Sequence, residues 1–179
     1  GSCTLSSGYC KTLDQEFNGG EVDIYGLEAS LSQTFELDSG FSLPTKLTYT
    51  HTQSEFQTGF RSEFSQWGHV KVGDELPYLP EHQMSFEFGI EGDNWRVMSL
   101  IKFVSAMAEA AGDDTELSGF ETDELVQLDL SASYQYNNKI KFYGKVDNVT
   151  DELTIVSRRP FGARPNKPRQ ASVGVKYEF

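Results

Sequence analysis

The last nine residues of the chain, ASVGVKYEF, alternate strictly between apolar and polar side chains. A period of two is the signature of a β-strand that has one face against an apolar medium. The apolar face of this segment carries Ala171, Val173, Val175, Tyr177 and Phe179. That medium can be a protein core or membrane lipid, and the rest of the sequence has to decide between them.

Six further segments show the same alternation, and none shows helical periodicity. They cover residues 21–37, 41–56, 82–91, 95–104, 125–136 and 139–147. The segment 95–104 alternates least well, because Met98, Leu100 and Val104 lie on its otherwise polar side. The sequence therefore predicts an all-β fold of about seven antiparallel strands.

The connections between these segments alternate in length. Short turns are expected at 38–40, 92–94 and 137–138, and long loops at 57–81, 106–123 and about 150–169. Strands joined up and down then have every short turn at one end and every long loop at the other. This segregation is typical of outer-membrane β-barrels, which have short periplasmic turns and long extracellular loops.

The polar faces of the strands carry charges that suit a water-filled barrel interior better than a packed core. They include Asp129, Lys141, Lys145, Asp147 and Glu178. We therefore expect the apolar faces to contact lipid. The sequence has no apolar run long enough for a membrane-spanning helix, and no signal peptide is visible at its start.

Composition excludes several classes of function. The formal net charge of −12 over 179 residues disfavours a nucleic-acid partner, which needs a basic surface. Nucleophile-elbow, phosphate-loop and helical metal-binding motifs are absent, so no enzymatic activity is expected. The three histidines, His51, His69 and His82, are too far apart in sequence to show the short spacing of a metal site.

Cys3 and Cys10 are the only cysteines and lie in a Ser/Thr/Gly-rich stretch. Their proximity favours a small disulfide-closed loop in an oxidising compartment over two free thiols. Both alternatives remain open from the sequence.

Three stretches resemble the C-terminal part of a TonB-dependent outer-membrane receptor, with the ferric dicitrate and ferric siderophore receptors as the nearest group. They are GGEVDIYGLEASLSQTF, LPYLPEHQMSFEFGIEGDNWRV and GKVDNVTDELTIVSRRPFGARPNKPRQASVGVKYEF. Together they cover much of the chain, and the specific pieces are the EVDIYGLE strand, LPYLPEHQ before a strand, DNVTDE and the terminal Phe.

The resemblance implies a transporter of a ferric chelate, such as ferric citrate or a siderophore, in the outer membrane of a Gram-negative bacterium. Family members have a plug domain inside a barrel of about 22 strands. We therefore expect residues 1–179 to be the C-terminal third of such a barrel, with the plug domain outside this chain. The implied partners are the remaining strands and plug of the same receptor, the TonB complex, the barrel-assembly machinery, lipid and lipopolysaccharide.

The same resemblance assigns candidate roles to individual residues. Iron arrives already wrapped in its chelator, so no cofactor and no direct metal ligand is expected. Basic and aromatic side chains in the long loops are candidates for binding an anionic chelate. The alternative for the arginines of the last loop is pairing with acidic interior residues or lipopolysaccharide, and for the 57–81 loop it is that exposed loop residues close over one another. These candidates are Arg61, Trp67, His69, Arg158, Arg159, Arg164 and Arg169. A C-terminal aromatic strand resembles the signal that the barrel-assembly machinery reads, here Val173, Val175, Tyr177 and Phe179.

Two other classes of protein are weighed against this interpretation. A soluble β-sandwich binding module of a secreted protein would also contain regular strands and aromatic loops. It requires a second sheet over apolar residues such as Leu27, Leu31 and Phe86. An outer-membrane enzyme or autotransporter barrel would need a catalytic group or a passenger that the sequence does not contain.

Overall fold

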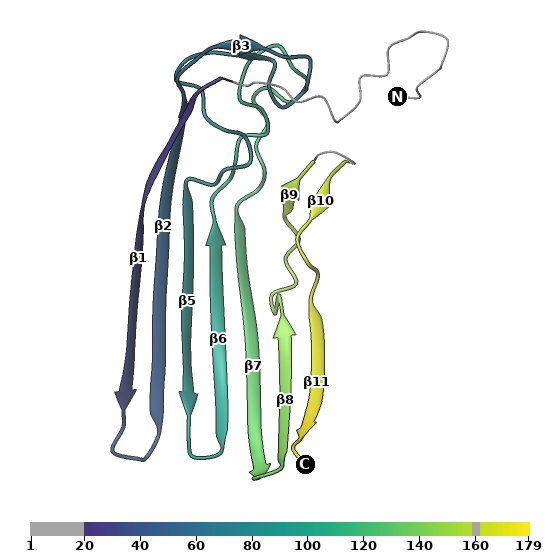
Figure 1. Cartoon of the computed structure of the whole chain (residues 1–179). Helices are drawn as coiled ribbons and strands as arrows, with labels where there is room; N and C mark the ends of the chain where they lie inside the picture. Colours follow the sequence, from purple (N-terminus) through teal and green to yellow (C-terminus); the bar gives the residue numbers. More distant parts are fainter. Residues whose placement is uncertain (1–19, 159–161) are drawn as a thin grey trace.

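The computed structural model describes residues 20–158 and 162–179, which form an open antiparallel β-sheet with loops gathered at one end (Figure 1). The seven strands of the main sheet lie in the order β1-β2-β5-β6-β7-β8-β11. Their bounds are Val22–Glu36 (β1), Ser42–Phe56 (β2), His82–Glu91 (β5), Trp95–Val104 (β6), Leu125–Asn137 (β7), Ile140–Asp147 (β8) and Gln170–Tyr177 (β11). The seven predicted strands are confirmed, within a few residues at each end.

Four short strands in the loops were not predicted from the sequence. Phe60–Arg61 (β3) pairs with His69–Val70 (β4), and Ile155–Ser157 (β9) pairs with Arg164–Pro165 (β10). Each is two or three residues long, so none is long enough to show a period of two. In the described part of the chain, no helix is long and apolar enough to cross a membrane.

The short turns and the long loops lie at opposite ends of the sheet (Figure 1). The turns β1–β2, β5–β6 and β7–β8 are at the end where the C-terminus lies, and the β2–β5, β6–β7 and β8–β11 loops are at the other. Each pair of neighbours is antiparallel. The segregation of loop lengths expected from the sequence is therefore present.

The register places apolar residues of neighbouring strands side by side on one face. One transverse row runs through Leu31, Leu47, Phe86, Ile101 and Leu128. The adjacent row, one residue along each strand, is polar and lies on the opposite face because side chains alternate. It runs through Ser30, Thr48, Ser85, Lys102 and Gln127.

The three apolar residues predicted on the polar side of β6 are found there, with Val104 opposite Gln83. Leu100 pairs with Glu87 and Asp129, and Met98 pairs with Gly89 and Ser131. The Met98 side chain occupies the space that a Cβ atom at Gly89 would need. Met98 thus covers a glycine on the neighbouring strand, which is a local packing reason for an apolar residue on this face.

The apolar face of the sheet has no cover among the described residues. The side chain of Leu31 is 70% exposed and that of Leu27 is 62% exposed. The two other sheets of the described chain are two-stranded and lie in the loops. The second sheet that a β-sandwich requires is therefore not present in residues 20–158 and 162–179, and the sandwich alternative loses its support.

Hydrophobic burial is found in the loops instead of beneath the sheet. The buried apolar side chains of the described chain are Phe56, Val70 and Leu117. Phe56 ends β2, Val70 is in β4, and Leu117 is in the β6–β7 loop. The loops thus have a small core of their own, and the sheet needs an apolar environment on one face.

Candidate ligand-binding loops

The β2–β5 loop folds around an aromatic cluster at the end of β2. The rings of Phe56, Phe60 and Trp67 contact one another with edge-to-face geometry and centroids 5.5–6.1 Å apart. The backbone pairing of β3 with β4 closes the loop over this cluster. Trp67, predicted as a ligand contact, is therefore also part of the core of the loop.

The β6–β7 loop packs against the β2–β5 loop through backbone hydrogen bonds. The amide of Ala111 donates to Gln66 O (2.9 Å), His69 N donates to Asp113 O (2.8 Å), and Tyr78 N donates to Ala108 O (3.0 Å). These bonds join two segments that are far apart in sequence. The two loops therefore form one packed unit.

An exposed ion pair between Lys71 and Asp113 links the same two loops. The hydrogen bond from the Lys71 ammonium, together with its charge, lowers the pKa of the Asp113 carboxyl below its usual range. The same contact raises the pKa of Lys71. Both side chains are therefore charged across the whole neutral range.

Arg158 joins the β8–β11 loop to this unit. Its Nη1 forms an ion pair with the carboxylate of Glu109, which is completely buried, and also donates to Glu121 O (2.7 Å). A buried carboxylate needs such a partner, because an unpaired charge removed from water is very costly. The pairing with an acidic group, one of the alternatives given by the sequence, is what the structure shows for Arg158.

Arg61 and His69 lie beside each other as partners in the β3–β4 ladder. Arg61 Nη2 is 3.4 Å from His69 Nδ1 and 3.9 Å from a carboxylate oxygen of Asp114. The Arg61 side chain is 72% exposed. The structure therefore brings together Arg61, Trp67 and His69 in one loop, with the guanidinium facing solvent.

The other predicted arginines occupy the β8–β11 loop. Arg169 forms an ion pair with Asp151 at 3.3 Å, whereas Arg164 in β10 is exposed and has no ion-pair partner among the described residues. Arg159 lies outside the described residues, as do Cys3 and Cys10. The proposed disulfide therefore stays a prediction.

The DNVTDE stretch anchors the base of the β8–β11 loop through Asn148, which is completely buried. Its backbone N–H donates to Asp129 Oδ1, and its side-chain amide donates to the carbonyls of Glu152 and Lys167, each at 2.9 Å. Asn148 has φ = 51°, a left-handed conformation that asparagine tolerates better than most residues. One side chain thus holds both ends of the loop.

Beneath this anchor, Asp129 sits buried on the polar face of β7. Lys102 Nζ is 2.9 Å and Gln127 Nε2 is 2.7 Å from its carboxylate oxygens. The buried charge is therefore paired and hydrogen-bonded. It connects strands β6 and β7 to the start of the β8–β11 loop.

The predicted barrel-assembly strand is β11, at one edge of the described sheet. Val173 and Val175 are exposed on the apolar face, and the Tyr177 and Phe179 rings contact each other with centroids 5.1 Å apart. Phe179 is fully exposed. The four residues thus form one continuous apolar strip.

Sequence reasoning missed Glu109, Asn148 and Phe56 as residues that organise the loops. Their burial depends on contacts between separate loops, which no local pattern reports. The DNVTDE stretch is the one signal that could have pointed to Asn148, because asparagine is enriched among residues with positive φ.

Comparisons with known proteins agree with this architecture. Residues 3–149 match the family model described as TonB dependent receptor-like, beta-barrel. No curated protein sequence matches the chain significantly.

Three solved structures illustrate the likeness of fold. The copper transporter OprC is 18% identical (TM-score 0.65, 88% of this chain), and the siderophore receptor PiuA from Acinetobacter baumannii is 17% identical (TM-score 0.64, 88%). The ferric yersiniabactin uptake receptor FyuA from Yersinia pestis is 18% identical (TM-score 0.65, 90%). The match covers 22–24% of those three chains, so this chain spans about a quarter of their length. With the family model matching most of its residues, the chain belongs to the TonB-dependent receptor β-barrel family.

Proposed function

We propose that this chain is part of a TonB-dependent transporter that takes up a ferric chelate, ferric citrate or a siderophore, across the outer membrane of a Gram-negative bacterium. The observation that carries the proposal is the pair of unlike faces, one mainly apolar and one mainly polar, across all seven strands. A sheet of this kind suits lipid on one side and a water-filled interior on the other.

The proposal gives the packed loops the role of capturing the chelate. Ferric citrate and carboxylate siderophores are anionic, and arginine binds carboxylates through two parallel hydrogen bonds. Of the predicted arginines, Arg61 and Arg164 present exposed guanidinium groups, whereas Arg158 is occupied by Glu109. We assign chelate contact to Arg61 and Arg164, with Trp67 and His69 lining the surface beside Arg61.

The remaining partners follow from the same proposal. Strands β1 and β11 each have one edge without a partner in the described sheet, and an unpaired edge cannot face hydrocarbon. Further strands of the same receptor would pair with these edges, and its plug would contact the polar face and respond to the TonB complex. The β11 strip would be read by the barrel-assembly machinery, with lipid and lipopolysaccharide on the apolar face afterwards.

Uptake of radioactive iron tests this function directly. A strain lacking the receptor is supplied with the full-length receptor and given ⁵⁵Fe as ferric citrate or as a ferric siderophore. The wild-type receptor should restore uptake of one of them, and Arg61→Ala or Arg164→Ala should weaken chelate binding about tenfold or more. The control is Lys139→Ala, which removes one exposed positive charge at the opposite end of the sheet. Absence of uptake with every ferric chelate, despite folded receptor in the membrane, would overturn the proposal.

A further inference from the structure

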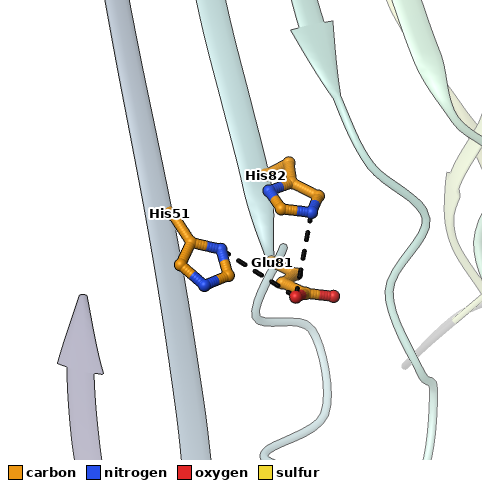
Figure 2. A group of neighbouring side chains, drawn as sticks. All are labelled: His51, Glu81 and His82. Atoms are coloured by element: carbon orange, nitrogen blue, oxygen red, sulfur yellow. Dashed lines mark ion pairs between the residues drawn. The ribbon is translucent and has the colours of Figure 1, made fainter. Parts of the chain in front are cut away.

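The pairing of β2 with β5 places two histidines directly opposite each other. His51 and His82 are register partners, so their side chains lie on the same face of the sheet, the face of Leu47 and Phe86, nearer to the loops. Their rings stack with centroids 4.9 Å apart and planes inclined by 22°. Glu81, the residue just before β5, turns its carboxylate toward both rings (Figure 2).

The three side chains converge on one point. Glu81 Oε1 is 3.9 Å from His51 Nδ1 and 3.7 Å from His82 Nε2. The candidate ligand atoms of all three residues lie within 4.8 Å of one another. Ligands at about 2.0–2.1 Å from a tetrahedral zinc ion are roughly 3.4 Å apart. Closing the cluster around an ion therefore takes side-chain rotations that bring these atoms nearer and turn the stacked rings toward one point.

The imidazole of His82 presents one nitrogen to the cluster. His82 Nδ1 is 2.9 Å from the hydroxyl of Tyr49, which leaves Nε2 on the side of Glu81. When Nδ1–H donates to that hydroxyl, Nε2 keeps its lone pair for a metal. This arrangement matches the outer hydrogen bond that metal-binding histidines usually make.

His51 contributes a nitrogen that is otherwise unused. Its Nδ1 is buried and has no hydrogen-bond partner among residues 20–158 and 162–179. The nearest acidic atom, Glu81 Oε1, is beyond hydrogen-bond distance. A buried polar atom without a partner is uncommon and calls for a ligand.

The backbone around the cluster is held on both sides. Thr52 N donates to Glu81 O (2.9 Å), and Ser105 N donates to His82 O (2.9 Å). The amide of His82 donates to Ser105 Oγ (3.1 Å). The positions of the three residues are therefore set before any ligand binds, and Glu81 is accessible because its side chain is 55% exposed.

We propose that His51, Glu81 and His82 form a binding site for a divalent transition-metal ion of the zinc class, at the loop end of strands β2 and β5. Two imidazoles and one carboxylate suit zinc, whereas magnesium and calcium prefer oxygen ligands alone. Three protein ligands leave a fourth position for water or an exogenous anion. The bound ion would fasten β2 to β5 where the sheet meets the loops.

The test measures zinc binding to the full-length receptor purified in detergent, with Zn²⁺ itself as the probe. Competition against a coloured chelator gives the affinity and stoichiometry for wild type, His51→Gln, His82→Gln and Glu81→Gln. His69→Gln is the matched control, because it removes the one other histidine of this chain. Migration on an unboiled gel verifies that each variant is a folded barrel.

Wild type should bind one zinc ion with micromolar affinity that each cluster variant lacks. His69→Gln should still bind this ion. Tyr49→Phe should weaken binding about 10–100-fold without abolishing it, since the hydroxyl only orients His82. Co²⁺ in place of zinc should give a d–d absorption band that His82→Gln removes. Equal zinc binding by wild type and the two histidine variants, all folded, would overturn the proposal.

Discussion

Arg158 forms an ion pair with Glu109, whose side chain is completely buried between the loops. Arg158 follows β9 in the β8–β11 loop, whereas Glu109 belongs to the β6–β7 loop. Because the β6–β7 loop is itself hydrogen-bonded to the β2–β5 loop, the pair connects all three long loops. The predictions below begin with this contact.

Replacing Arg158 by alanine should open the loop unit. The change leaves the buried Glu109 carboxylate without its cation, which typically costs about 3–5 kcal/mol. Hydrogen exchange of the full-length receptor should show faster exchange in peptides covering 106–123, where Glu109 N donates to Phe120 O (3.0 Å). The double variant Glu109→Leu/Arg158→Met removes both charges and should recover most of the protection.

The control for that experiment is Arg164→Ala, in the same loop but without an ion-pair partner in the described chain. Its exchange pattern should equal that of wild type. Unchanged protection in Arg158→Ala would show that the ion pair does not hold the loops together.

Asn148→Ala should loosen the base of the β8–β11 loop. The change removes three side-chain hydrogen bonds and places alanine at φ = 51°, which together cost about 2–5 kcal/mol. Trypsin can cleave in this loop after Arg158 and Arg169, whereas Arg159, Arg164 and Lys167 each precede a proline and resist it. Cleavage there should become at least about tenfold faster, since it follows the open population.

Asn148→Gly separates the two contributions, because glycine adopts positive φ without strain. It should be cleaved at a rate between those of wild type and Asn148→Ala. Asn94→Ala, at an exposed turn on the opposite end of the sheet, serves as the unaffected control. Equal rates for the alanine and glycine variants would refute a cost from the backbone conformation.

Arginine substitutions at two adjacent residues of β2 should distinguish the two faces of the sheet. Leu47 belongs to the apolar row and Thr48 to the polar row. Leu47→Arg should destabilise the inserted barrel by about 2–4 kcal/mol, the cost of arginine on a lipid face near the midplane. Thr48→Arg should fold nearly normally. Urea unfolding of the receptor in lipid vesicles measures both, and a similar loss for the two variants would contradict the assignment of faces.

The Lys71–Asp113 ion pair predicts how the mobility of the loops depends on pH. The pKa of Asp113 is lowered below 3.8. Its contribution to holding the two loops together is therefore complete above pH 3.8 and disappears as the pH falls through the lowered pKa. The pKa of Lys71 is raised above 10.5. Its contribution to holding the loops together is therefore complete below pH 10.5 and disappears as the pH rises through the raised pKa. A spin label at the exposed Val72 should therefore be least mobile between these limits.

Lys71→Gln is the control for the pH experiment, because it keeps an unbranched polar side chain and removes its charge. The variant should lose the pH dependence that is due to Asp113. A wild-type label whose mobility stays constant from pH 2 to pH 6 would argue against the pair as a link between loops.

The sheet could be predicted from the sequence, because alternation over eight to fifteen residues is a local signal. Even the irregular side of β6, with Met98 and Leu100, could be predicted in that way. The loop contacts could not, since the burial of Glu109 and the packing of Trp67 depend on segments that meet only in the folded chain. The same holds for His51 and His82, which are distant in sequence and adjacent only through the β2–β5 register.

The alternation of apolar and polar rows also has a consequence for folding. If one strand paired one residue out of register, its two faces would exchange places. For β6, such a slip would turn Arg96 and Lys102 toward lipid and Val97, Ile101 and Phe103 toward water. A mispaired strand would therefore also fail to enter the bilayer. Insertion into the membrane would thus favour the correct strand pairing, because hairpins whose charges point toward lipid would insert poorly.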